Sequence, residues 1–142
     1  MTEIEILNNS QLGFIQNAIY TVAVVFMTFI SFRLARIVNE KNSNILAKSL
    51  VTLYGIMMTF FSIQVGAYLS FYQKALSYNL AELKATGVKL SASSEDTISR
   101  YAVNLTDGFP KLTPELPTII ICTVVFLIVI GTTWIKTQSN KS

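Results

Sequence analysis

Three long stretches of this chain carry no charged side chain, and they limit its fold more than any other feature. They are Ile6–Phe32, Ser49–Gln73 and Leu116–Ile135, of 27, 25 and 20 residues. An α-helix rises about 1.5 Å per residue, so about 20 mainly apolar residues cross the roughly 30 Å hydrocarbon core of a bilayer. Only 13% of the 142 residues are charged and 51% are hydrophobic, which is atypical of a water-soluble domain. The sequence therefore predicts an all-α integral membrane protein with three transmembrane helices.

The segments between these stretches predict a single three-span domain over residues 1–142. Its expected parts are an N-terminal lead (1–12), a first span (13–38), a cytoplasmic loop (39–47), a second span (48–73) whose helical pattern continues toward 86, an outer loop (87–116), a third span (117–136) and a tail (137–142). The short first loop predicts that the first two helices form an antiparallel hairpin. In the outer loop, Ser93 or Ser94 followed by two acidic residues is typical of a helix N-terminus. We therefore expect a short amphipathic helix over 94–106.

Small and polar residues recur at helical spacing on the first two spans. In the second span they are Thr52, Gly55, Thr59, Ser62, Gly66, Ser70 and Gln73; in the first they are Asn17, Thr21, Thr28 and Ser31, followed by Ala35. Spacings of three and four residues, with Val24 filling the gap between Thr21 and Thr28, place each set along one face of its helix. Small residues let helices approach closely in a membrane, and hydroxyl groups can bond between them. We expect the two stripes to face each other and to satisfy their hydroxyls across the contact.

Basic residues gather at one end of the expected hairpin and predict its orientation. Arg33, Arg36, Lys41 and Lys48 lie there with a single acid, Glu40. Positively charged loops face the cytoplasm, and tryptophan beside lysine, as in Trp134 and Lys136, is typical of a membrane interface. These residues are expected to be topology anchors that contact membrane lipid. The N-terminus would lie outside and the C-terminus inside, most simply at the plasma membrane.

The residues that usually carry chemistry are scarce. The chain has no histidine and one cysteine, Cys122, which lies within the third apolar stretch. Histidine-dependent metal sites and catalytic triads are therefore excluded, and a disulfide within the chain is impossible. The charge-free stretches also lack the intramembrane ionisable groups that mark pumps and ion pathways. We expect no catalytic residues, no metal and no cofactor, and the scattered basic residues do not indicate nucleic-acid binding.

Two functions remain open from the sequence. The first is a non-catalytic accessory or structural subunit that packs against other integral membrane subunits of a larger complex. The second is a homo-oligomeric pore or lesion-forming protein, because the chain resembles three-span phage holins in size, topology and moderately polar helix faces. In a pore, the stripe on the second span would face water. The sequence does not choose between hetero-oligomer and homo-oligomer.

Overall fold

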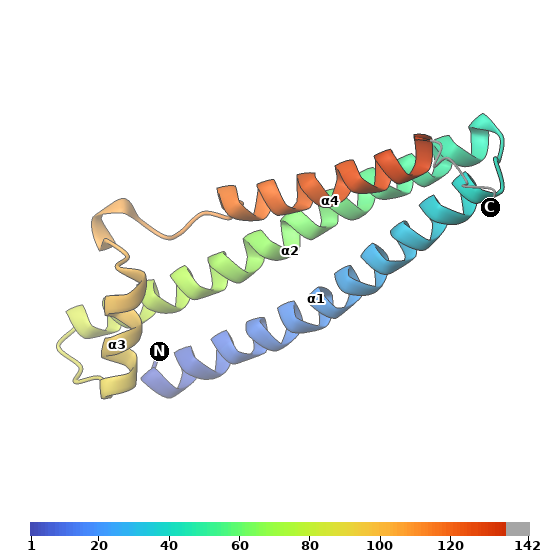
Figure 1. The fold of residues 1–142 in the computed structure, drawn as a ribbon. Coiled ribbons are helices and arrows are strands. Elements are labelled where there is room, and N and C mark those ends of the chain that lie inside the picture. The colour runs from blue at the N-terminus through green and yellow to red at the C-terminus, as the bar shows by residue number, and fades with distance from the viewer. Residues whose placement is uncertain (136–142) are drawn as a thin grey trace. The chain divides into compact units, whose positions relative to one another are not determined.

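The computed structural model describes residues 1–135, and these residues form helices without strands (Figure 1). The elements are α1 (Glu3–Glu40), α2 (Ile45–Ala85), α3 (Ala92–Tyr101), the 3₁₀ helix η1 (Leu105–Asp107) and α4 (Leu116–Trp134). Three of them, α1, α2 and α4, are long and apolar enough to cross a membrane. This confirms the all-helical fold and the three membrane-length helices. Lys136 and the predicted tail 137–142 lie outside the described residues.

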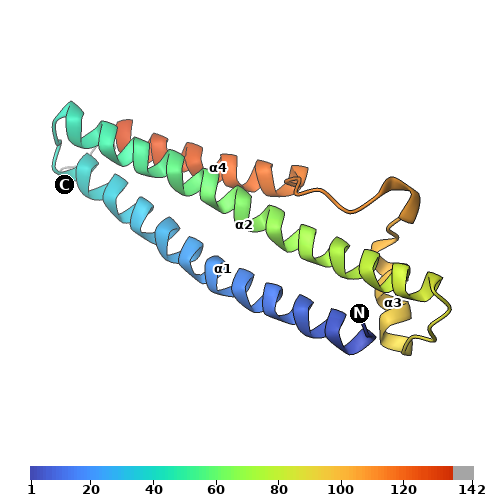
Figure 2. The same ribbon diagram turned by 180° about the vertical axis from the view of Figure 1, so that it is seen from behind.

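The chain divides into two compact units. Unit 1 comprises Met1–Ile19 and Gly66–Glu115, and unit 2 comprises Tyr20–Val65 and Leu116–Ser142. Unit 1 thus contains the first part of α1, the second part of α2, α3 and η1. Unit 2 contains the remaining parts of α1 and α2 together with α4. In unit 2, α4 runs beside the first part of α2 in both views (Figures 1 and 2).

The first helix begins ten residues before its predicted start, so the expected lead of residues 1–12 is wrong from Glu3 onward. Thr2 and Glu5 explain the early start because they form a reciprocal cap. The Thr2 backbone N–H donates to the Glu5 carboxylate at 2.7 Å, and the Glu5 N–H donates to the Thr2 hydroxyl at 3.3 Å. Such a capping box satisfies two of the backbone donors that a helix start leaves free.

The connection between α1 and α2 is only four residues long, 41–44, rather than the predicted 39–47. Two asparagines shorten it. Asn42 adopts φ 47°, in the left-handed region that asparagine tolerates, and the Ser43 N–H bonds back to the Val38 carbonyl at 3.0 Å. The Asn44 side chain then caps α2 by accepting from the Ala47 N–H at 2.9 Å. The turn reverses the chain, so the α1 and α2 segments of unit 2 are antiparallel.

The second helix continues to Ala85, as its extended pattern predicted, and the turn that follows it contains Gly87, whose φ is +89°. The next helix differs from the prediction at both ends. Its N-cap is Ser91, not Ser93 or Ser94, and it ends at Tyr101 because Ala102 takes a left-handed conformation with φ 39°. Residues 105–107 form η1 instead of continuing the helix to 106. The third apolar helix, α4, begins at Leu116, one residue before its predicted start.

Each unit has a small apolar core. In unit 2, Ala35 and Val38 of α1, Val51 of α2 and Val129 of α4 pack together. In unit 1, Ile6, Leu80 and Leu90 form the cluster, with Ile98 of α3 against it. Large apolar side chains on the outer faces remain exposed, among them Ile19, Phe26 and Phe29 of α1, Phe60 of α2, and Ile121 and Leu127 of α4. Such outer faces suit lipid or other membrane helices.

Candidate functional site

The close helix contact in unit 2 is centred on Gly55. A Cβ atom placed on Gly55 would lie 3.4 Å from a Val129 methyl group and 3.5 Å from the Phe126 ring, both on α4. The stripe of α2 therefore meets α4 at this point, whereas the sequence analysis placed α1 against it. The spacing of residues along α2 shows which of them share a face, but it does not show which other helix packs against that face. Here the helix is α4, which lies more than 60 residues later in the sequence.

The hydroxyl groups of the stripes bond within their own helices. Thr52, Thr59 and Ser62 of α2, and Thr28 and Ser31 of α1, each donate to the carbonyl four residues earlier at 2.7–3.0 Å. The expectation that these hydroxyls satisfy one another across the two helices is wrong. Serine and threonine satisfy themselves in this way when no better acceptor is near. The link between α1 and α2 here is through the buried Met58 sulfur, which lies 3.5 Å from the Thr28 hydroxyl.

The other predicted packing residues differ in burial. Asn17 and Ser31 are buried, Thr28 is half-buried and Thr21 is exposed on α1. On α2, Gly55 is buried, and Thr52, Thr59, Ser62, Gly66, Ser70 and Gln73 are all half-buried. No residue of the stripe on α2 is thus fully exposed, while the stripe on α1 is interrupted by the exposed Thr21.

A polar cluster joins α2 and α4 at the end of unit 2 that carries the basic residues. The Trp134 indole N–H donates to the Thr52 hydroxyl at 3.0 Å, and the Lys48 ammonium lies 5.7 Å from the centre of the indole ring. A cation over an aromatic face is a favourable contact. Trp134 and Lys48 were expected only as separate membrane anchors, and the structure brings them together.

A second contact in this region ties α1 to the end of α4. The Asn39 side-chain amide donates to the Thr132 carbonyl and, at 2.7 Å, to the Ile135 carbonyl. These two carbonyls belong to the last turn, where a helix has no backbone donors left to bond. Of the other predicted anchors, Arg36 pairs with Glu40 at 2.7 Å, and Arg33 and Lys41 are exposed. Lys136 lies outside the described residues.

In unit 1, the tightest helix contact is between Gly13 and Tyr72. A Cβ atom on Gly13 would lie 2.7 Å from the Tyr72 ring, closer than a real side chain could approach. The ring is held by edge contacts with Phe14 and Phe71, at centroid distances of 6.2 and 5.7 Å. Gly13 is the first residue of the predicted first span, but it was not among the predicted packing residues. The sequence analysis listed the packing residues of the first span from Asn17 onward, so it did not include Gly13.

The most extensive polar contact of unit 1 attaches the start of α1 to α3. The Glu3 carboxylate accepts hydrogen bonds from the Ser91 N–H at 3.1 Å and from the Ser91 and Ser94 hydroxyls at 2.6 Å each. The carboxylate thus occupies the N-terminus of α3, where free N–H groups favour a negative charge. An ion pair between Lys84 of α2 and Glu95 of α3, at 3.0 Å, ties the same helix to α2. Sequence reasoning missed the Glu3 contact, because the partners are 88 or more residues apart.

Ser70 and Lys74 of α2 hold the end of the loop that leads to α4. The Lys74 ammonium lies 3.2 Å from the Glu115 carboxylate. A hydrogen bond from the Ser70 hydroxyl, and then the hydrogen bond and charge of Lys74, lower the pKa of the Glu115 carboxyl. Ser70 was predicted as a helix-packing residue, and in the structure its hydroxyl forms a hydrogen bond with Glu115 at the end of the loop.

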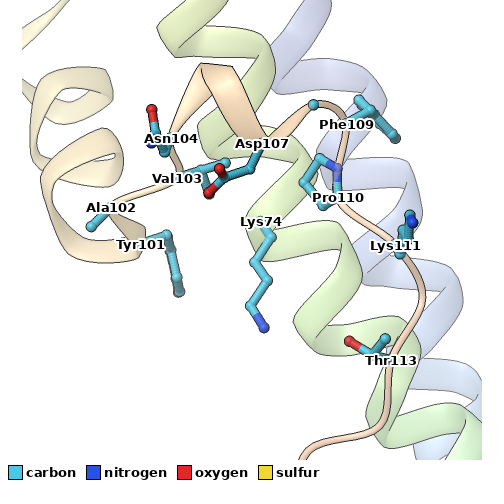
Figure 3. A pocket seen from close by; sticks show the side chains of 11 residues that line it. Lys74, Tyr101, Ala102, Val103, Asn104, Asp107, Phe109, Pro110, Lys111 and Thr113 are labelled. Atoms are coloured by element: carbon cyan, nitrogen blue, oxygen red, sulfur yellow. The ribbon is translucent and has the colours of Figure 1, made fainter.

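The loop between α3 and α4 encloses one side of a cavity of about 490 Å³ (Figure 3). Its lining comes from Lys74 on α2, Tyr101 at the end of α3, the η1 region and the extended segment up to Thr113. The cavity is open to its surroundings, and both cationic and anionic side chains reach it: Lys74, Lys111 and Asp107. It was not predicted, because its lining residues are brought together only by the fold of the loop.

Within residues 1–135, no group of three His, Cys, Asp or Glu side chains is placed to hold a metal ion. Cys122 of α4 is half-buried. No protein-family model, no curated protein and no solved structure matches the chain. The site is therefore interpreted from its own chemistry.

Proposed function

We propose that this chain is a non-catalytic integral membrane protein that serves as an accessory or structural subunit of a larger membrane complex. The observation that carries the proposal is how the polar stripe of α2 is used. Around Gly55 it packs against α4 of the same chain, and the hydroxyls of Thr52 and Thr59 bond their own helix. This part of the stripe is covered by α4 and is therefore not free to line an aqueous path.

The outer faces of the helices supply the surface for partners. In the most apolar part of α1 and of α4 only 11% of the residues are buried, against 28% in α2. α2 is therefore the helix around which the chain packs, and the other two present wide apolar faces. Such faces bind lipid or neighbouring helices, and association between helices in a bilayer depends on shape and on small residues.

The proposed orientation has the N-terminus outside and the C-terminus inside the plasma membrane. It rests on the basic residues near the α1–α2 turn, where Arg33 and Lys41 are exposed. Two single-cysteine variants in a Cys122→Ser background test it: Ser93→Cys in α3 and Ser43→Cys in the turn. A membrane-impermeant maleimide added to intact cells should label Ser93→Cys and spare Ser43→Cys. The reverse labelling would overturn the orientation.

The subunit proposal is tested by what accompanies the chain after mild detergent extraction. Native mass determination should find the 15.8 kDa chain in larger assemblies that contain other polypeptides. A stable lone monomer would contradict the proposal.

The alternative, a homo-oligomeric pore similar to phage holins, predicts a different result. Liposomes that contain only this chain should release a trapped dye if it forms pores and should stay tight if it is an accessory subunit. Release that changes when Thr59 is replaced by Val would support the pore, because Thr59 lies on the stripe that would then face water.

A further inference from the structure

The cavity of unit 1 is open to its surroundings and has the volume of a small-ligand site. At about 490 Å³ it falls within the roughly 300–1,000 Å³ typical of such sites. Its walls come from α2, the end of α3, η1 and the segment around Pro110 (Figure 3). It is distinct from the helix-packing contacts on which the proposed function rests.

Two opposite charges in this cavity have no partner. Among residues 1–135, Asp107 and Lys111 form no ion pair, either with each other or with another side chain. The neighbouring ions behave differently, since Lys74 pairs with Glu115 and Arg100 pairs with Asp96. The cavity therefore presents a separate carboxylate and a separate ammonium group. A ligand that carries both charges would pair with each of them.

The aromatic side chains suit the cationic part of such a ligand. Phe109 and Tyr101 both line the cavity, together with Asp107. Phe109 is fixed by edge contacts with Tyr78 and Phe71, at centroid distances of 5.4 and 6.0 Å. An ammonium group is attracted to aromatic faces as well as to a carboxylate. Lys111 also lines the cavity, and a lysine ammonium is a good partner for a phosphate.

The cavity lies close to the membrane along the chain. Thr113, on its lining, precedes Leu116, the first residue of the candidate span α4, by three residues. Even fully extended, three residues span at most about 11 Å. The layer that holds the phosphate groups of lipid headgroups lies directly outside the hydrocarbon and is about 5–8 Å thick on each side.

We propose that this cavity binds a zwitterion bearing a phosphate and an ammonium group, with the phosphate at Lys111 and the ammonium at Asp107. Two sources share this chemistry: the headgroup of phosphatidylethanolamine in the membrane, and free phosphoethanolamine in solution.

The test measures binding to the full chain in a non-ionic detergent. The probes are short-chain dihexanoyl-phosphatidylethanolamine, dihexanoyl-phosphatidylglycerol, which lacks the ammonium, and free phosphoethanolamine. The variants are Lys111→Gln and Asp107→Asn, both at exposed side chains. The matched controls Lys89→Gln and Glu82→Gln remove the same charges from exposed positions that do not line this cavity. Circular dichroism verifies that each variant is folded.

We expect saturable binding of the ethanolamine lipid that weakens about tenfold in Lys111→Gln and in Asp107→Asn, and stays unchanged in the controls. The glycerol lipid should bind more weakly, and Asp107→Asn should strengthen its binding because a repulsive carboxylate is removed. If free phosphoethanolamine binds with the same dependence on both residues, the site is supported and its ligand is soluble. If only the lipid does so, the site is supported and its ligand is membrane lipid.

Two results would overturn the proposal. One is binding that is equal in all variants, or reduced equally in the controls. The other is dependence on Lys111 alone, which would make the cavity a simple anion site. Neither bears on the accessory-subunit proposal, which is judged by copurification.

Discussion

The two units of this protein differ in the contacts that join their helices. In unit 2 the hydroxyls of Thr59 and Ser31 bond carbonyls of their own helices, and the helices meet mainly through apolar contact. In unit 1 the side chains of Glu3 and Lys84 bond other elements, at 2.6–3.1 Å. The helices of unit 2 are also joined by polar contacts, from Asn39 and Trp134 at its end and from the Thr28 hydroxyl to the Met58 sulfur.

A bilayer and water place different demands on polar groups. Within a bilayer no water is available, so a polar group that cannot find a partner costs several kcal/mol, and self-contained helices are the stable solution. Outside the hydrocarbon, an unpaired charged side chain remains hydrated, so an ion pair that opens there costs little free energy. Glu3 and Lys84 of unit 1 join elements through charged groups, and the helices around Gly55 in unit 2 are joined by close apolar packing.

The two close glycine contacts give the sharpest test of this comparison. Gly13→Ala should destabilise the protein by about 1–3 kcal/mol, because the new methyl group would meet the Tyr72 ring at 2.7 Å and the ring is held by aromatic neighbours. Gly55→Ala meets Val129 at 3.4 Å, an ordinary contact, and should cost less. Gly131→Ala, whose nearest neighbour is 3.8 Å away, is the control and should be neutral or slightly stabilising. Reversible unfolding by SDS in mixed micelles measures all three, and equal effects would contradict the ranking.

The second test asks whether a hydroxyl in unit 2 matters only when it bonds another helix. Thr52→Val leaves the Trp134 N–H without its acceptor and should cost about 1 kcal/mol. Thr59→Val removes only a bond to its own helix and should be close to neutral. Trp134 is the only tryptophan, so its fluorescence should also shift in Thr52→Val and not in Thr59→Val. An unchanged emission spectrum in Thr52→Val would show that the bond is not formed in micelles.

The third test addresses the polar attachment in unit 1. Glu3→Gln removes the charge that accepts hydrogen bonds from Ser91 and Ser94, so α3 should open more often. Hydrogen exchange of the amides of 92–101 should become several-fold faster, while the amides of α4 keep their rates. Glu82→Gln, an exposed acid of α2, serves as the control. If exchange in α3 does not change, its position depends on Ile98 and the apolar cluster instead.

The smallest expected effect is a pH dependence at Glu115. Because Ser70 and Lys74 lower its pKa in the folded protein, Glu115 contributes stability above its unfolded pKa and loses it as the pH falls through the lowered value. Both side chains of the ion pair are over 40% exposed, so the change should be small and local. Hydrogen exchange of the 108–115 segment, expressed relative to the intrinsic exchange rate at each pH, should therefore increase on acidification in the wild type. In Glu115→Gln it should be fast at every pH, and a retained pH dependence would assign the effect to another group.

The boundaries of the helices separate local from distant causes. The caps Thr2 with Glu5, and Asn44 at the start of α2, are local patterns, so in principle they were readable from the sequence. The choice of Ser91 over Ser93 or Ser94 as the cap of α3 was not. Ser91 is the cap because its backbone N–H and its hydroxyl both donate hydrogen bonds to the carboxylate of Glu3, which lies 88 residues away in the sequence.

The sequence by itself determined the three membrane-length helices, because charge-free stretches of 20 to 27 residues have few other stable forms. It also placed the polar residues of α2 on one face, since helical spacing is a local property. Only the tertiary structure decided that α4 covers this face at Gly55, that Asn39 bonds the end of α4, and that Asp107 and Lys111 share a cavity. The physical reason is that these contacts join segments far apart in the chain, and their free energy depends on distances that spacing along the sequence does not set.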